Sequence, residues 1–168
     1  LQEHQLEDKT TVLIMGGSLG FGEVRDVFKA LMSSKRQLQI IAITGKNSKL
    51  KRQLEKHANN TNNLVKLLSY TDKVADLMEV SDFIITKPGG MTITEALVKN
   101  LPIIITSPLP GVEERNSNFL MNNGAAVRLL ENENIESVLN QIMDNPLRIS
   151  HMKSMANQLA KPNSSRDI

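Results

Sequence analysis

The sequence predicts an α/β fold in which a parallel sheet of about six strands carries helices on both faces. The first observation is that short apolar runs alternate with amphipathic stretches along the 168 residues. The second is that these runs are apolar almost throughout, as in Ile103–Ile105, which is typical of strands buried on both faces. The third is that hydrophobic residues make up 40% of the chain, yet no apolar run approaches the roughly 20 residues of a membrane-spanning helix.

The first half of the chain predicts three strands, and a helix follows each of the first two. Each strand is a run rich in apolar and β-branched residues, and each helix has apolar side chains at helical spacing. The expected elements, in chain order, are Thr11–Met15, Gly22–Ser33, Leu38–Thr44, Ser48–Asn59 and Leu64–Leu68.

In the second half, residues with strong turn preferences set the boundaries. Asp72 is a favoured N-cap for a short helix, Gly124 is a C′ residue that ends a helix, and Pro146 suits a first helical turn. The expected strands are Phe83–Thr86, Pro102–Thr106 and Ala125–Leu129, and the expected longer helices are Thr92–Lys99, Asn116–Asn123, Glu133–Met143 and Pro146–Ala160.

Composition excludes several classes of function. The net charge is only +2 and aromatic residues make up 3% of the chain, so the sequence lacks the basic footprint and the stacking platforms of nucleic-acid-binding proteins. There is no cysteine, which excludes disulfides and thiolate metal sites and is compatible with a reducing cytoplasm.

Three loops at the carboxyl edge of the predicted sheet carry the functional signal, because ligands of such sheets bind outside the carboxyl ends of the strands. The first loop is Gly16–Gly22, Gly-Gly-Ser-Leu-Gly-Phe-Gly. Its glycines allow a ligand to approach the backbone, but a tight strand-to-helix turn needs them equally. It is not a dinucleotide fingerprint, because the second strand ends Thr44-Gly45-Lys46 without an acidic residue, and it lacks the Gly-Lys-Ser/Thr of a P-loop.

The second loop, Lys87-Pro-Gly-Gly-Met-Thr-Ile-Thr-Glu95, is the strongest signal. A helix opens directly after the strand, so free backbone N–H groups at its positive end face outward and suit a phosphate. Glu95, one turn later, is placed to accept hydrogen bonds from a sugar hydroxyl, which together predicts a nucleoside diphosphate. Gly89 and Gly90 allow unusual dihedral angles. Thr92 and Glu95 also have the spacing of a capping box, which needs no ligand, so both interpretations stay open.

The third loop, Pro108–Asn116, brings several polar side chains to the start of a helix. Glu113, Glu114 and Asn116 crowd this helix start. Acidic residues at a helix N-terminus stabilise the helix without any ligand. The functional alternative is that Glu113 and Asn116 bind sugar hydroxyls.

In order along the chain, these loops resemble the C-terminal half of a GT-B glycosyltransferase. The motifs are Gly-Gly-Ser after the first strand, Thr86-Lys-Pro-Gly-Gly-Met-Thr-x-Thr-Glu95 after the fourth, and Pro110-Gly-x-Glu-x-x-Asn116 after the fifth. More narrowly, the chain resembles family 28, with the processive diacylglycerol glucosyltransferases of bacteria and the plant monogalactosyldiacylglycerol synthases. The resemblance covers roughly Thr11 to Ala160. It implies one Rossmann-like half of a GT-B fold.

That resemblance implies a division of the chain and a set of donor-binding residues. We expect a linker or tail at 1–10, a UDP-sugar-binding C-terminal domain at 11–161 and a tail at 162–168, all cut from a longer protein. Glu95 would hold the ribose, backbone N–H groups of Gly89 to Thr92 with Ser18 the diphosphate, and Tyr70 or the Thr71 backbone the uracil. The whole implied set is Gly17, Ser18, Tyr70, Thr71, Lys87, Pro88, Gly89, Gly90, Met91, Thr92, Glu95, Gly111, Glu113 and Asn116, of which Glu113 and Asn116 would meet the hexose.

The implied reaction is displacement of UDP from the anomeric carbon by an acceptor hydroxyl, with inversion. No Asp-x-Asp motif is present, so we expect neither a metal nor a cofactor. None of His4, His57 and His151 is a persuasive general base, and the family places the base in an N-terminal domain that this chain lacks. The implied partners are UDP-glucose or UDP-galactose, that N-terminal domain, and diacylglycerol at the cytoplasmic face of a membrane, where the full protein would be peripheral.

Two competing hypotheses about the function remain. The chain is alternatively part of another UDP-sugar enzyme, such as the peptidoglycan N-acetylglucosaminyltransferase or a UDP-N-acetylglucosamine epimerase. The second hypothesis, from a different class of function, is that the chain is a non-catalytic nucleotide-binding or interaction module.

The sequence also contains a basic surface, formed by Lys49, Lys51, Arg52 and Lys56. This surface either assists binding to anionic lipid or is an ordinary solvated helix face.

Overall fold

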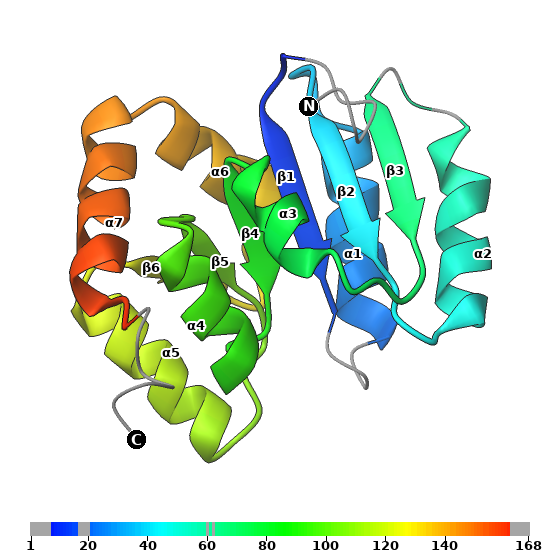
Figure 1. Cartoon of the computed structure of the whole chain (residues 1–168). Coiled ribbons are helices and arrows are strands. Elements are labelled where there is room, and N and C mark those ends of the chain that lie inside the picture. Colours follow the sequence, from blue (N-terminus) through cyan, green and yellow to red (C-terminus); the bar gives the residue numbers. More distant parts are fainter. Residues whose placement is uncertain (1–7, 17–20, 60, 62, 162–168) are drawn as a thin grey trace.

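The computed structural model describes residues 8–16, 21–59, 61 and 63–161, with side chains from 24 onward in the first helix. Within these residues, strands and helices alternate along the chain as predicted (Figure 1). The strands are β1 (Thr11–Met15), β2 (Gln39–Ile43), β3 (Leu64–Leu68), β4 (Phe83–Thr86), β5 (Ile103–Ile105) and β6 (Ala126–Arg128). The helices are α1 (Phe21–Met32), α2 (Ser48–Ala58), α3 (Val74–Glu79), α4 (Gly90–Val98), α5 (Val112–Asn122), α6 (Ile135–Met143) and α7 (Pro146–Leu159).

The six strands form one parallel sheet in the order β3-β2-β1-β4-β5-β6. The chain runs outward from β1 to β3 and then returns to the other side of β1 with β4. The strand order therefore reverses between β1 and β4, which is where ligands bind in sheets of this topology. This confirms the predicted Rossmann-like α/β fold.

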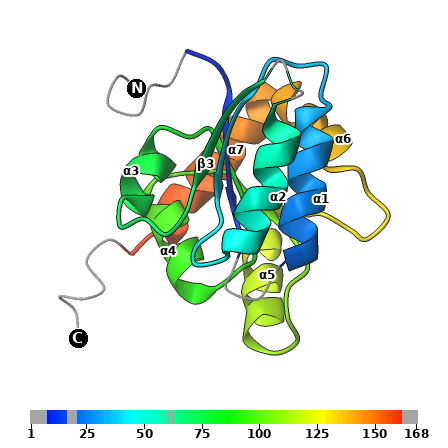
Figure 2. The ribbon, with the colours of Figure 1, turned by 90° about the vertical axis from the view of Figure 1, so that its right-hand side faces the viewer.

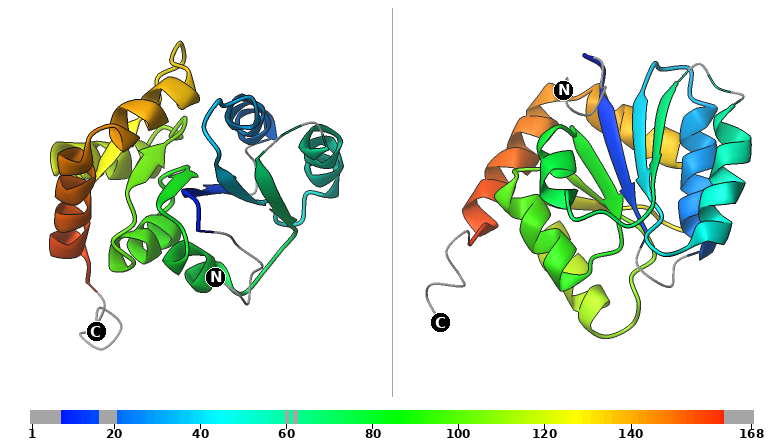
Figure 3. Two further views of the ribbon diagram at one scale, coloured as in Figure 1. Left: turned by 90° about the horizontal axis from the view of Figure 1, so that it is seen from above. Right: turned by 45° about the vertical axis from the view of Figure 1, so that its right-hand side comes forward.

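Helices bury both faces of the sheet, because neighbouring residues of a strand point to opposite sides. Val12 and Ile14 of β1 belong to one apolar cluster, with α1, α2 and α6. Leu13 belongs to the other, with α3, α4, α5 and part of α7. Figure 2 sees the sheet edge on, with α1 and α2 on one side and α3 and α4 on the other, and Figure 3 shows the same layers from above.

Side-chain hydrogen bonds fix the three central strands at their amino ends. The Asp82 carboxylate accepts from the Thr11 backbone N–H at 2.8 Å, and the Asp82 N–H donates to the Thr11 carbonyl at 2.8 Å. The buried Gln39 amide donates to the Thr11 hydroxyl at 2.7 Å. Because β1, β2 and β4 are held in this register, the loops at their carboxyl ends have fixed relative positions.

Several helix starts differ from the expected ones. The helix α1 begins at Phe21 rather than Gly22, and α6 begins at Ile135 rather than Glu133. The helix α4 begins at Gly90 rather than Thr92, and α5 begins at Val112 rather than Asn116. Asp72 does not cap α3, whose N-cap is Lys73, and the Lys73 N–H donates to the Thr71 hydroxyl at 3.1 Å. Among the described residues, no helix combines the length and the apolar character needed to cross a bilayer.

Candidate functional site

The loop after β4 lies beside the end of β1 at the carboxyl edge of the sheet. Met15 of β1 pairs with Thr86 of β4, so Gly16 and Lys87 are the next residues of two neighbouring strands. The start of α4 lies at this edge, the lower one in Figure 1. Gly17 and Ser18, the rest of the first predicted loop, lie outside the described residues. The first and second predicted loops therefore begin side by side.

The first turn of α4 offers a row of unpaired backbone donors. The N-cap residue is Gly89, and no side chain caps the helix. Within the described part of the chain, the N–H groups of Gly90, Met91 and Thr92 have no acceptor, whereas the Ile93 N–H already donates to the Gly89 carbonyl at 3.0 Å. These donors and the helix dipole make the N-terminus of α4 a suitable place for an anion.

The glycines of this loop are not needed by the backbone. Gly89 has φ −68° and ψ 139°, which any residue adopts, and Gly90 is not among the residues with positive φ. The unusual dihedral angles that these glycines allow are therefore not used in the structure. A Cβ atom at either position would meet nothing within 4 Å among the described residues, which leave this space open. Glycine at such a place allows another molecule to approach the main chain closely.

The capping-box interpretation of Thr92 and Glu95 is wrong. Thr92 is the third residue of α4 and not its N-cap, and the hydroxyl that bonds backwards is that of Thr94, which donates to the Gly90 carbonyl at 2.8 Å. The Glu95 side chain is exposed and has no partner among the described residues. Its carboxylate is therefore available to a ligand at the start of α4.

Charged groups lie at both ends of α4. Lys87 is half-buried beside the helix start, and its ammonium has no partner in the part of the chain that is described. At the other end, Lys99 Nζ contacts Glu79 Oε2 at 2.5 Å. The hydrogen bond from Lys99, together with its charge, holds the pKa of Glu79 below its usual value. Within the described residues, Lys87 is thus a cation without a partner next to the uncapped start of α4.

The third loop joins the second through Asn116. Its side-chain amide donates to the carbonyl of Pro88 at 2.9 Å, and Pro88 itself is buried. The helix α5 starts early because Gly111, with φ 100°, reverses the chain, and the Glu113 carboxylate accepts from the Leu109 N–H at 2.8 Å. Sequence reasoning missed the early start of α5, although a Pro-Gly pair before two glutamates is a helix-start signal.

The predicted base contacts lie at the same edge but on a more distant strand. Tyr70 and Thr71 follow β3, which is separated from β4 by β2 and β1. Tyr70 is 73% exposed, so its ring is available to another molecule. The structure joins the second and third loops through Asn116 and Pro88, and it places the second loop beside the end of β1. Tyr70 and Thr71 follow β3 at the same edge of the sheet.

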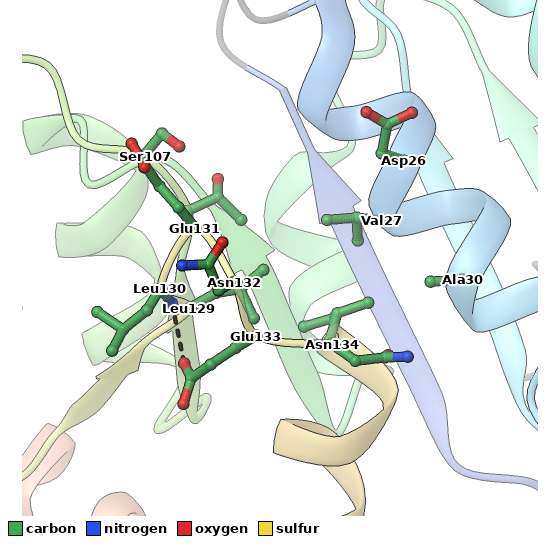
Figure 4. A pocket seen from close by; sticks show the side chains of 12 residues that line it. Asp26, Val27, Ala30, Ser107, Leu129, Leu130, Glu131, Asn132, Glu133 and Asn134 are labelled. Atoms are coloured by element: carbon green, nitrogen blue, oxygen red, sulfur yellow. Dashed lines mark hydrogen bonds between the residues drawn. The ribbon is translucent and has the colours of Figure 1, made fainter.

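A separate pocket of about 570 Å³ lies at the ends of β5 and β6, on the α1 side of the sheet (Figure 4). Its walls include Asp26 of α1, Ser107 after β5, and Glu131 and Glu133 of the loop before α6. The Glu133 carboxylate accepts from the Leu130 N–H at 2.9 Å. None of the predicted site residues lines this pocket, and its carboxylates are unsuitable for a diphosphate. Sequence reasoning did not single it out.

Comparisons with known proteins agree with this arrangement. The family model described as the glycosyltransferase family 28 C-terminal domain matches residues 11–168. The chain is 33% identical to a processive diacylglycerol beta-glucosyltransferase of Bacillus licheniformis, over 99% of the chain and 44% of that protein. It is 35% identical to the enzyme of the same name from Bacillus pumilus, over 96% of the chain and 42% of that protein. The chain thus spans less than half the length of these relatives.

Solved structures show the same fold. The crystal structure of MurG from Acinetobacter baumannii has a TM-score of 0.78 and 26% identity, over 99% of this chain and 50% of that one. The structure of MnaA from S. aureus has a TM-score of 0.74 at 19% identity, over 95% of this chain and 44% of that one, and it shares the fold alone. Since the family model matches all six strands and all seven helices described above, the chain belongs to the family of glycosyltransferase family 28 C-terminal domains.

Proposed function

We propose that this chain is the donor-binding domain of an inverting glycosyltransferase that transfers a hexose from a UDP-sugar to diacylglycerol. The names of the 33% and 35% identical relatives support the acceptor and the transferred hexose. Because those relatives are more than twice as long, the acceptor site and the general base belong in this proposal to the remainder of the full protein. That protein would work at the cytoplasmic face of a membrane, as a peripheral enzyme.

The observation that carries the proposal is the open, uncapped start of α4. Gly89 and Gly90 have no positive φ angle that would require glycine, and the N–H groups of Gly90, Met91 and Thr92 have no partner within the described residues. A diphosphate bound there explains both facts. Glu95, exposed one turn along, would accept hydrogen bonds from the ribose hydroxyls.

The same geometry supplies a mechanism for the leaving group. As the glycosidic bond to UDP breaks, negative charge grows on the terminal phosphate oxygens. Backbone donors that are already oriented, together with the ammonium of Lys87, stabilise that charge without reorganisation. In this proposal no metal ion is required. Asn116 and Glu113 would orient the hexose from the start of α5.

Calorimetric titration with UDP tests the proposal. We expect the chain to bind UDP, with the same affinity in the presence of Mg²⁺ and of a chelator. Replacing Glu95 by Gln should weaken binding about tenfold or more, because a hydrogen bond to a charged group is lost. The matched control is Glu55→Gln, since Glu55 is another exposed helical glutamate without a partner in the described chain. Equal affinity of the two variants, or no binding of UDP at millimolar concentration, would contradict the proposal and favour a non-catalytic module.

The alternative of another UDP-sugar enzyme is distinguished by the hexose and the acceptor. A 26% identical relative, MurG, matches the chain over its whole length, so the fold admits other donors. We expect UDP-glucose or UDP-galactose to bind more tightly than UDP-N-acetylglucosamine. The reverse order would favour the alternative.

A further inference from the structure

One segment of the chain carries a run of positive charge. The segment 46–56 carries five positive side chains and one negative one, whereas the whole chain has a net charge of only +2. We name these cations the basic face of α2: Lys46, Lys49, Lys51, Arg52 and Lys56. This helix covers the end of the sheet at β3, on the right in Figure 1.

The charges of the basic face are available to a partner. Lys46, Lys49, Arg52 and Lys56 are exposed. Within the described residues, the ammonium groups of Lys46, Lys49 and Lys56 have no hydrogen bond or ion pair. Arg52 uses only Nε, which donates to the Ser48 carbonyl at 3.3 Å. An ordinary solvated helix would intersperse acids to neutralise such a row, but α2 carries only Glu55.

The basic face is also hollowed. A depression of about 530 Å³ lies at the ends of β2 and β3, and Lys46, Lys51, Arg52, Glu55 and Tyr70 are among the residues that line it. Lys51 Nζ donates to the hydroxyl of Ser69, which also lines it, at 3.2 Å. Three cations and one carboxylate give the depression a net positive charge, which suits the phosphate of a lipid headgroup. Because Tyr70 follows β3, the depression adjoins the carboxyl edge of the sheet, where the donor is proposed to bind.

We infer that the basic face of α2 docks the protein on a membrane surface that contains anionic phospholipid. The inference rests on the proposed function, since a diacylglycerol acceptor lies in a bilayer. A membrane at this face lies next to the carboxyl edge, so an acceptor in it is brought toward the donor site. A nucleic acid is the less suitable partner, because aromatic residues make up only 3% of the chain.

Vesicle sedimentation tests the inference. The full 168-residue chain is mixed with phosphatidylcholine vesicles, either pure or containing about one third phosphatidylglycerol. We expect binding only to the anionic vesicles, and a loss of binding as salt is raised. The triple variant Lys49→Gln/Arg52→Gln/Lys56→Gln should bind about 100-fold more weakly, because each cation near the surface contributes separately.

The control removes the same charge from the opposite end of the molecule. Arg148, Lys153 and Lys161 are exposed on or just after α7, far from α2 in Figure 1. The variant Arg148→Gln/Lys153→Gln/Lys161→Gln should bind anionic vesicles nearly as well as the wild type. Both triple variants should keep the wild-type UDP affinity, which separates a failure of docking from a failure of the proposed function.

Three results would overturn the inference. The first is equal vesicle binding by the two triple variants. The second is release from vesicles by millimolar inorganic phosphate but not by sodium chloride of the same ionic strength, which would mean a site for free phosphate. The third is binding of a short single-stranded oligonucleotide without any binding of anionic vesicles.

Discussion

Gly89 and Gly90 differ from the other glycines of the described chain in what they do. Gly111 and Gly124 have φ angles of 100° and 70°, so the backbone itself requires glycine there. Gly89 and Gly90 have no such requirement, and a Cβ atom at either would meet no atom of the described residues within 4 Å. In our proposal, their small size leaves room for the diphosphate.

Replacing Gly89 or Gly90 by alanine should separate stability from binding. The free energy of unfolding should stay constant or rise by up to about 1 kcal/mol, because the unfolded chain loses freedom and the folded chain gains no strain. UDP affinity should fall about tenfold or more, since the methyl group occupies the space of the phosphate. Thermal unfolding and calorimetry measure the two quantities.

Gly111→Ala is the matched control for that prediction. It should lower the free energy of unfolding by about 1 kcal/mol or more, since its φ of 100° strains any other residue. If Gly89→Ala destabilises the protein and leaves UDP affinity unchanged, the glycines serve the fold and the argument for the ligand fails.

At the scale of single residues, the sequence was sufficient to predict which residues carry the functional features, but it was insufficient to predict which residues they contact. The N–H row at the start of α4 and the exposed Glu95 follow from a helix that opens directly after a strand. The dihedral angles of Gly89 cannot be predicted in this way, because they depend on the exact residue at which α4 begins. The contact of Asn116 with Pro88 joins residues 28 positions apart, and no local pattern encodes it.

Among the elements, α5 supports the loop that opens α4. Its Glu114 forms an ion pair with Arg128 of β6 at 2.7 Å, which ties the start of α5 to the sheet. From that fixed start, Asn116 holds the carbonyl of Pro88. The loop before α4 is thus positioned by a neighbouring helix in addition to its own strand.

Asn116→Ala should weaken UDP binding even though UDP carries no hexose. The Pro88 carbonyl loses its partner, so the free energy of unfolding should fall by about 1 kcal/mol and UDP affinity by about threefold. UDP-glucose affinity should fall further, because the proposed hexose contact is lost as well. Calorimetry with both ligands measures the difference.

The control for Asn116 is Asn118→Ala, two residues along the same helix. Asn118 is exposed and its side chain has no partner within the described residues, so neither quantity should change. An Asn116→Ala protein with unaltered UDP affinity and weaker UDP-glucose binding would mean that Asn116 serves the hexose alone.

The elements were predicted with unequal success for a physical reason. Strands such as β3 and β4 have the expected bounds, because their apolar runs end at polar or turn residues on both sides. The starts of α4 and α5 were placed two and four residues late, because Gly90 and Val112 have low helix propensity and the tertiary contacts of their neighbours override it.

For the whole molecule, we propose that the donor site is one wall of a cleft that the remainder of the longer protein completes. The open N–H row, Glu95 and Lys87 all face solvent or a shallow surface, whereas the 570 Å³ pocket belongs to other loops. A donor bound here would keep much of its surface in water. Efficient transfer needs that water excluded and the acceptor hydroxyl activated.

Neither of the two described histidines lies where it could activate an acceptor hydroxyl at the proposed donor site. His57 lies in the last turn of α2, at one end of the molecule. His151 lies over Gly124 at the end of α5 opposite to the donor site, where its Nε2 would be 2.9 Å from a Cβ atom on Gly124. Neither has a hydrogen bond to any residue of the α4 start within the described chain. The base in our proposal therefore comes from the remainder of the longer protein.

The 168-residue chain should accordingly bind UDP-hexose without multiple turnover. The chain is mixed with UDP-hexose and with anionic vesicles that contain diacylglycerol, and a coupled assay measures the UDP that is released. We expect less than one molecule of UDP per molecule of chain, because the oriented donors stabilise the leaving group but no base deprotonates the acceptor hydroxyl. A full-length diacylglycerol glucosyltransferase, assayed with the same vesicles, shows that donor and acceptor are competent. Sustained release of many equivalents by the chain alone would mean that the base lies within it, and Glu113 at the start of α5 would then be the first residue to replace.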